Sequence, residues 1–200
     1  MRVGLFGGSF NPAHSGHALV AKTALTQLRL DQVVWLVSPQ NPLKSADETA
    51  DLAVRLAQTK ALVRGQIHGR AMAVSDFESR IGARYTIDTL RALKARFPGV
   101  KFVWIMGADS LASLHRWRGW LEIMALVPVA VIARPGAQIK SRLAPAARRF
   151  GHARLRHESS HTLADHSAPA WTYLTVPLDP ASSSAIRAKV RKVKPDSDGQ

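Results

Sequence analysis

Two glycines and two histidines near the N-terminus have the residue types and the spacing of an anion-binding site. Gly7 and Gly8 end the first apolar run, and His14 and His17 stand three residues apart at the start of a predicted helix. Because glycine has no Cβ, backbone N–H groups at this turn can approach a phosphate. Histidines at this spacing share one helix face, beside the free N–H groups of the first turn. The segment therefore predicts phosphate binding, and its turn also contains Ser9 and Phe10.

The histidine pair has two other interpretations. The rings could simply cap the helix, which is the usual role of an isolated pair at a helix start, or they could bind a metal ion, although no obvious third ligand stands nearby. The glycines do not form the dinucleotide pattern Gly-x-Gly-x-x-Gly, and the chain has no Gly-Lys-Ser/Thr P-loop. Hydride transfer and P-loop hydrolysis are therefore disfavoured.

A second anion site is predicted near the C-terminus. Ser182, Ser183 and Ser184 open a predicted helix, and Arg187 follows Ile186 one turn in. Hydroxyl groups, free N–H groups and a guanidinium in this order can hold a phosphate. Alone, the serine run would be an ordinary helix cap. Paired with the glycine–histidine segment, it predicts the other half of a triphosphate site.

Alternating strands and helices must position these groups. Apolar runs of strand length cover residues 2–6, 32–37, 71–77, 101–106, 129–133 and 171–176, and helical patterns cover 18–28, 49–63, 86–97 and 111–126. This alternation predicts right-handed crossovers and a Rossmann-like α/β fold, a doubly wound parallel sheet with helices on both faces. Such sheets bind ligands at the carboxyl ends of their strands. We expect one domain over residues 1–194, no clear periodicity between 137 and 169, and a frayed tail at 195–200.

The composition limits the class of protein. Lys and Arg outnumber Asp and Glu by 28 to 14, and the net charge of +14 favours a partner that carries phosphates, whether a nucleotide, a nucleic acid or a membrane surface. A solvated basic face is an equally good interpretation of most of these charges. The chain has no cysteine, which excludes disulfides, thiolate catalysis and cysteine-ligated zinc. No apolar run approaches the ~18 residues that cross a bilayer, and no secretory pattern begins the chain. We therefore expect a soluble, cytoplasmic protein without a membrane partner.

The first motif resembles a known signature. Residues 7–17, Gly-Gly-Ser-Phe-Asn-Pro-Ala-His-Ser-Gly-His, are similar to the signature of the bacterial nicotinate-nucleotide adenylyltransferases, within the nucleotidyltransferase superfamily that carries His-x-Gly-His. Residues 182–187 resemble the C-terminal motif of that superfamily, with Ala181 and Ser184 in place of its outer Ile and Thr. Further similar stretches lie at 76–90, 107–120 and 134–136, so the resemblance covers nearly the whole chain apart from 145–168.

The resemblance implies an activity. It is adenylyl transfer from ATP to nicotinate mononucleotide, giving nicotinate adenine dinucleotide and pyrophosphate, a step of NAD biosynthesis. Mg²⁺ would accompany ATP and lie on phosphate and water, without a cage of protein ligands. The strand that ends before Gly107 should then neighbour the first strand.

The resemblance also assigns residues. His14, His17 and Arg187 would be catalytic. The ATP site would contain Gly7, Gly8, Ser9, Phe10, His14, His17, Gly107, Asp109, Ser183, Ser184, Ile186 and Arg187. The mononucleotide site would contain Asn41, Lys44, Tyr85, Thr86, Trp117 and Arg134, with backbone amides around Thr86 and Trp117 receiving the nicotinate carboxylate.

Several alternatives stay open. The acceptor could be nicotinamide mononucleotide or phosphopantetheine, Trp117 could be core packing, and Asn41 and Lys44 could be solvated loop residues. Asp76 and Glu78 are expected on one strand face, where a structural role is favoured.

Two further alternatives lie in other classes. The segment 157–161, His-Glu-Ser-Ser-His, matches the zinc-peptidase pattern, although its serines are weak helix formers. The charge would also suit a nucleic-acid-binding module, but the sequence has no evident stacking platform or helix-turn-helix pattern, so no specific nucleic-acid partner is expected. The oligomeric state is left open.

Overall fold

The computed structural model describes residues 1–39, 49–133, 141, 143–176, 183 and 186–187. Several predicted features lie outside these residues. They are Asn41, Lys44, Arg134, Ser182, Ser184 and the tail at 195–200. No helix among the described residues is long and apolar enough to span a membrane.

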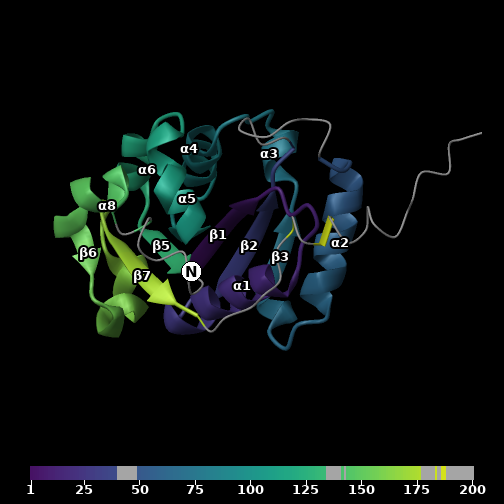
Figure 1. Cartoon of the computed structure of the whole chain (residues 1–200), viewed down its shortest axis with the longest axis horizontal. Coiled ribbons are helices and arrows are strands. Elements are labelled where there is room, and N and C mark those ends of the chain that lie inside the picture. Colours follow the sequence, from purple (N-terminus) through teal and green to yellow (C-terminus); the bar gives the residue numbers. More distant parts are fainter. Residues whose placement is uncertain (40–48, 134–140, 142, 177–182, 184–185, 188–200) are drawn as a thin grey trace, which may run out of the picture.

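A parallel sheet of seven strands forms the centre of the described structure (Figure 1). Its strands are β1 (Arg2–Gly8), β2 (Gln32–Val37), β3 (Met72–Ser75), β4 (Lys101–Gly107), β5 (Val129–Ala133), β6 (Arg154–Leu155) and β7 (Trp171–Thr175). Their order is β3-β2-β1-β4-β5-β7-β6, and each neighbouring pair is parallel. Strands buried on both faces need continuous apolar runs, as in β5, where every residue is buried. The predicted fold class is confirmed.

The pairing of β1 with β2 and β4 places Gly7 and Gly8. The strand predicted to end at residue 6 continues through both glycines, which pair with Leu36 and Val37 of β2, so the turn begins after Gly8. Arg2 to Phe6 pair with Lys101 to Ile105, while β2 lies on the other side of β1. The chain order therefore reverses at β1, because β2 and β3 lie on one side and β4 and β5 on the other. A crevice opens at the carboxyl end of the strands at such a reversal. The predicted proximity of β1 and β4 is confirmed.

Helices cover both faces of the sheet. They are α1 (Ser15–Gln27), α2 (Leu52–Arg64), α3 (Phe77–Arg80), α4 (Thr86–Arg96), α5 (Ala108–Ser113), α6 (Trp120–Leu126) and α8 (Pro145–Arg149), with 3₁₀ helices η1 (Gly69–Ala71), η2 (Leu114–Arg116), η3 (Gly151–Ala153) and η4 (His157–Asp165). Residues of α4, α5, α6 and α8 join one apolar cluster, and residues of α1, α2 and η4 join another. Figure 1 shows α4, α5 and α6 grouped together and α2 beside β3.

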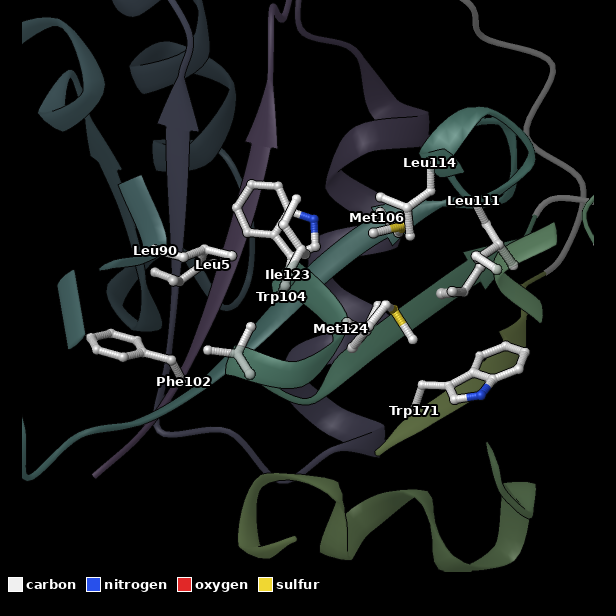
Figure 2. Packing of buried hydrophobic residues seen from close by; sticks show 14 of the residues in the cluster. Leu5, Leu90, Phe102, Trp104, Met106, Leu111, Leu114, Ile123, Met124 and Trp171 are labelled. Carbon is white, nitrogen blue, oxygen red and sulfur yellow. The ribbon is translucent and has the colours of Figure 1, made fainter. Parts of the chain in front are cut away.

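The first cluster packs large side chains from the sheet against α4 to α6. Figure 2 shows Leu5 and Trp104 from the strands near Leu90 and Ile123 from the helices. All four are nearly inaccessible to solvent. Burial of one such side chain stabilises the fold by about 2 kcal/mol. Sheet residues alternate between the two clusters, since Phe6 and Ile105 belong to the second.

Three local expectations were wrong. The strand predicted to reach residue 77 ends at Ser75, because the Ser75 hydroxyl accepts the Phe77 N–H and turns the chain into α3. Asp76 therefore occupies the N-cap position of α3, without a side-chain capping bond, and Glu78 lies within that helix, so the two do not share a strand face. The helix predicted over 111–126 is interrupted by η2 and by Gly119, whose φ of 66° ends helical geometry.

The segment without clear periodicity is structured. Residues 145–165 form α8, η3, the short strand β6 and η4. Short 3₁₀ helices have a period of three residues, so they leave no 3.6-residue pattern to detect. Leu163 of η4 is fully buried against the second cluster. Tertiary packing therefore orders this segment.

Candidate active site

A pocket of about 480 Å³ lies at the carboxyl ends of β1 and β4. Most of the described residues predicted to form the site line it. They are Gly7, Gly8, Ser9, Phe10, His14, His17, Tyr85, Thr86, Gly107, Asp109, Trp117 and Ser183. Residues from both ends of the chain and from its middle therefore share one cavity.

Gly7 has a packing reason to be glycine. A Cβ on Gly7 would overlap the indole ring of Trp104, which reaches the pocket from β4. Trp104 is 2% exposed and belongs to the first apolar cluster, so it cannot move aside without disturbing the core. The close approach of β1 to this ring therefore requires the missing side chain.

The two histidines combine a capping role with a place in the pocket. His14 is the N-cap of α1, and its Nδ1 accepts the Gly16 N–H at 3.2 Å. The Nδ1 of His17 accepts the His14 N–H at 3.3 Å, and the ring centroids are 3.9 Å apart. The capping alternative is thus correct for the Nδ1 atoms. In a neutral ring whose Nδ1 accepts, Nε2 carries the proton, so each Nε2 is a hydrogen-bond donor suited to an anion.

Phe10 packs against the histidine pair. Its ring is 2% exposed and packs edge-on against His17 at a centroid distance of 5.1 Å. It also contacts Phe6 and Trp35, which fixes it to the sheet. Its backbone φ of 43° lies in the left-handed region, which is uncommon for a residue with a side chain. Such conformations persist where the surrounding packing holds them.

The C-terminal motif reaches the glycine–histidine segment. The hydroxyl of Ser183 donates to the carbonyl oxygen of Pro12 at 3.0 Å, and the guanidinium of Arg187 donates to the carbonyl oxygen of Asn11 at 2.7 Å. Ser183, Ile186 and Arg187 are helical, as predicted. Ser183 lines the pocket, whereas Ile186 and Arg187 do not belong to its lining. The two motifs predicted to act together are in direct contact.

The carboxyl end of β4 and the start of α4 also line the pocket. Gly107 caps α5, and a Cβ there would stand in open space. Thr86 is the first residue of α4, where backbone N–H groups have no acceptor within the helix. The Trp117 N–H differs, because it donates to the Leu114 carbonyl at 2.8 Å. Trp117 lines the pocket and also packs on the first apolar cluster. The core-packing interpretation is therefore confirmed, and contact with the nicotinate ring stays a prediction.

Several lining residues were missed from the sequence. They are Ser38, Pro39, Glu78, Arg84, Ser110, Ser113, Arg116 and Arg118. Ser38 and Pro39 directly follow β2, so the rule about carboxyl ends of parallel strands could have found them. The three arginines stand next to the predicted residues Tyr85 and Trp117 in sequence, and that proximity was the available signal.

One of these arginines contacts a predicted residue directly. The guanidinium of Arg118 lies over the Tyr85 ring, 4.8 Å from its centroid. Both residues line the pocket. Cations are attracted to the face of an aromatic ring, so this contact holds a positive charge at that wall.

Glu78 is a buried carboxyl group in the pocket wall. It is 7% exposed, and its Oε1 accepts the Thr89 hydroxyl at 3.2 Å. Burial raises the pKa of Glu78 to about 7 from an ordinary 4.5, and the Thr89 hydrogen bond opposes the rise. The family-like stretch 76–90 contains this carboxyl, but the sequence indicated a structural role on a strand face, whereas the structure places Glu78 on α3 in the pocket wall.

The zinc-peptidase pattern does not form its usual geometry. His157 and His161 lie on η4, a 3₁₀ helix, where residues four apart point in different directions. The His161 Nδ1 lies 3.1 Å from the Glu158 carbonyl oxygen. Within the described ranges, no three His, Asp or Glu side chains gather as metal ligands would.

The fold and the pocket together define a class of protein. A parallel sheet with two glycines at the end of β1 and His-x-Gly-His at the start of α1 is the architecture of a Rossmann-like nucleotidyltransferase. The sequence model described as cytidylyltransferase-like matches residues 5–189. The chain belongs to this family and, within it, to the nicotinate-nucleotide adenylyltransferases. The resemblance seen in the motifs is confirmed.

Relatives match along nearly their whole length. A protein of Caulobacter sp. (strain K31) named "Probable nicotinate-nucleotide adenylyltransferase" is 64% identical over 192 residues, 96% of this chain and 100% of the relative. One of the same name from Methylorubrum extorquens (strain PA1) is 52% identical over 94% of this chain and 100% of the relative. A solved structure of Plasmodium falciparum nicotinic acid mononucleotide adenylyltransferase complexed with NaAD has a TM-score of 0.72 at 16% identity, covering 94% of this chain and 82% of that one. The latter likeness concerns the fold.

Proposed function

We propose that this protein transfers the adenylyl group of ATP to nicotinate mononucleotide, forming nicotinate adenine dinucleotide and pyrophosphate in NAD biosynthesis. The observation that carries the proposal is the contact of Ser183 and Arg187 with the segment that bears the histidine pair. The 64% identity to a relative named for this activity supports the choice of reaction and acceptor.

The reaction needs alignment more than proton transfer. A 5′-phosphate oxygen of the mononucleotide forms a bond to the α-phosphorus of ATP, and the bond between the α-phosphorus and the oxygen bridging to the β-phosphorus breaks. The electron pair of that bond leaves with pyrophosphate. Because the attacking oxygen is already an anion, the protein does not have to supply a general base. Its task is to hold the reactants in line and neutralise charge.

The histidine pair suits the α- and β-phosphates of ATP. With Nδ1 of each ring accepting a backbone N–H, the protonated Nε2 of His14 and His17 can donate to phosphate oxygens. The start of the thirteen-residue helix α1 adds the positive end of its dipole. Gly7 and Gly8 keep the backbone accessible at the same end of β1, next to Ser9 and Phe10.

The C-terminal motif suits the leaving pyrophosphate. Ser183 lines the pocket, and Arg187 is held at the same segment by its bond to Asn11. A guanidinium can form strong, charge-assisted hydrogen bonds with departing phosphate oxygens. Ser184 and Ile186 stay assigned to this site by resemblance, and Gly107 and Asp109 are assigned to the nucleotide on the β4 side.

The acceptor belongs at the wall formed by α4 and η2. We assign the nicotinate carboxylate to the N-terminus of α4, where the Thr86 N–H has no helical acceptor, and the pyridine ring to the space beside Tyr85 and Trp117. The backbone N–H of Trp117 already donates to the Leu114 carbonyl oxygen, so the backbone N–H of Thr86 is the better candidate to bind the carboxylate. Asn41, Lys44 and Arg134 remain candidates for the mononucleotide by resemblance.

Mg²⁺ fits this site as a partner of ATP. The lining residues that carry carboxylates in the described chain are Glu78 and Asp109. Of the two, the resemblance assigns Asp109 to ATP. Magnesium commonly binds through one or two carboxylates together with substrate phosphates and water. Bound there, the ion would neutralise triphosphate charge. The cytoplasmic location stays a prediction.

Pyrophosphate release tests the function. Purified protein is given ATP and Mg²⁺ with nicotinate mononucleotide, nicotinamide mononucleotide or phosphopantetheine in parallel assays. We expect nicotinate mononucleotide to give the highest kcat/KM of the three acceptors, because the Thr86 N–H at the start of α4 can bind its carboxylate. A higher kcat/KM with another acceptor would reassign the substrate, and no release with any of them would refute adenylyl transfer.

A further inference from the structure

Arg55 is a charged side chain buried beneath the pocket. It lies on α2, is 1% exposed and does not line the cavity. Its guanidinium donates four hydrogen bonds to backbone carbonyl oxygens: Nε to Ala50 at 2.7 Å, Nη1 to Ser9 at 2.8 Å and to Ser38 at 2.7 Å, and Nη2 to Pro39 at 2.8 Å. One rigid, planar group thus holds four points of the main chain.

The four carbonyls belong to segments that are far apart in the sequence. Ser9 is in the turn after β1, Ser38 and Pro39 directly follow β2, and Ala50 precedes α2. Of these, Ser9, Ser38 and Pro39 line the pocket. Two more bonds join the same segments, from the Ser38 N–H to the Gly8 carbonyl and from the Ala50 N–H to the Asn11 side chain. Arg55 therefore joins the turn after Gly8 to the segment that follows β2.

A guanidinium is well suited to this place. Burial lowers the pKa of Arg55 and the Asp51 carboxylate opposes that change, yet arginine retains its charge under ordinary conditions. Its donors point in fixed directions within one plane, whereas a lysine ammonium is a compact charge on a flexible chain. Substitution by lysine would keep the charge and lose the fixed spacing between the two turns.

We propose that Arg55 is a positioning residue for the adenylyl transfer: its four carbonyl bonds set the spacing between the phosphate-binding turn after β1 and the pocket wall after β2. The inference rests on the proposed function, because the glycine turn is assigned there to ATP. Arg55 touches no reacting atom and acts through Ser9, Ser38 and Pro39. A displacement of about 1 Å between groups that align substrates can cost on the order of 100-fold in rate.

The first test compares Arg55→Lys with Arg64→Lys. Arg64 is an exposed arginine on the same helix and serves as the matched control. At a temperature where circular dichroism shows both variants folded, Arg55→Lys should raise the KM for ATP about tenfold and lower kcat/KM for ATP about 100-fold. Arg64→Lys should match the wild type. A loss of folded protein alone would lower the apparent kcat and leave KM unchanged.

A second test removes the side chain and returns its chemical group. Millimolar guanidinium chloride should restore part of the activity of Arg55→Ala, whereas sodium chloride at the same ionic strength should not. The proposal is overturned if folded Arg55→Lys has the wild-type KM for ATP. It is also overturned if neither Arg55→Lys nor Arg55→Ala folds, because Arg55 would then contribute to stability alone. Wild-type protein without turnover would instead refute the proposed function, so the two failures are distinguishable.

Discussion

The guanidinium of Arg187 donates a hydrogen bond to the carbonyl oxygen of Asn11, 2.7 Å away and 176 positions earlier in the chain. Asn11 lies in the turn that leads to the histidine pair, and its side chain accepts the Ala50 N–H. One residue therefore connects the C-terminal motif, the glycine–histidine segment and the start of α2. This contact joins two short motifs into one candidate site for a triphosphate.

Arg187→Ala should lower kcat by about 100-fold or more, because a charge-assisted donor to the leaving phosphate is lost. The free energy of unfolding should fall by only about 1 kcal/mol, the usual net contribution of one hydrogen bond. Steady-state pyrophosphate release and urea unfolding measure the two effects. The matched control is Lys60→Ala, which removes an exposed positive charge from α2. Equal losses in both variants would indicate that general charge, not the position of Arg187, supports turnover.

His17→Ala should lower turnover severely, by about 100-fold or more, since one donor to developing phosphate charge disappears. The loss of its bond to the His14 N–H should cost about 1 kcal/mol of stability. His17→Asn separates these roles, because its side-chain oxygen can still accept that N–H while no Nε2 remains. His157→Ala, which removes an exposed histidine of η4, is the control. Wild-type turnover in His17→Ala would exclude the pair from the mechanism.

Gly7→Ala and Gly107→Ala should fail in different ways. The new methyl group at residue 7 overlaps the Trp104 ring, so the free energy of unfolding should fall by about 1–3 kcal/mol. At residue 107 the methyl group meets open space within the pocket, so stability should hold while the KM for ATP rises. Thermal unfolding and steady-state kinetics of both variants check the contrast. A stable Gly7→Ala protein would show that the Trp104 ring can move aside.

Glu78 should make stability depend on pH. Its pKa is about 7 in the folded protein and 4.5 ordinarily, so between these values the folded state keeps a proton that the unfolded state releases. The contribution is fully present below pH 4.5 and is lost as pH rises through 7, by on the order of 3 kcal/mol. Glu78→Gln removes this term and can still accept the Thr89 hydroxyl.

The measurement is urea unfolding of wild type and Glu78→Gln at several values of pH. The variant should gain stability relative to the wild type as pH rises from 4.5 to 7, because the wild type alone must bury a carboxylate. All other titrating groups are common to both proteins and cancel in the difference. A difference that stays constant across this window would place the Glu78 carboxyl in a more solvated environment than the pocket wall.

Features that depend on neighbouring residues could be predicted from the sequence. Apolar runs separated by helical periods predicted the parallel sheet, because a strand covered on both faces must be apolar throughout. The glycine turn and the spacing of His14 and His17 predicted groups gathered at one helix start, and α1 begins there with both rings in the pocket. These relations are set within about four residues, where local hydrogen bonds and helix geometry decide.

Contacts between groups that are distant in the sequence could not be predicted, because they depend on the folded arrangement of the chain. The role of Arg55 could not be predicted, because no neighbouring residue indicates that its guanidinium donates to four backbone carbonyls. The same holds for Trp104 beneath Gly7 and for Glu78, whose strand assignment was wrong because a single serine hydroxyl turned the chain into α3. Such contacts depend on strand order and on how helices pack across the sheet. Periodicity carries no information about either, so the folded chain must bring the partners together.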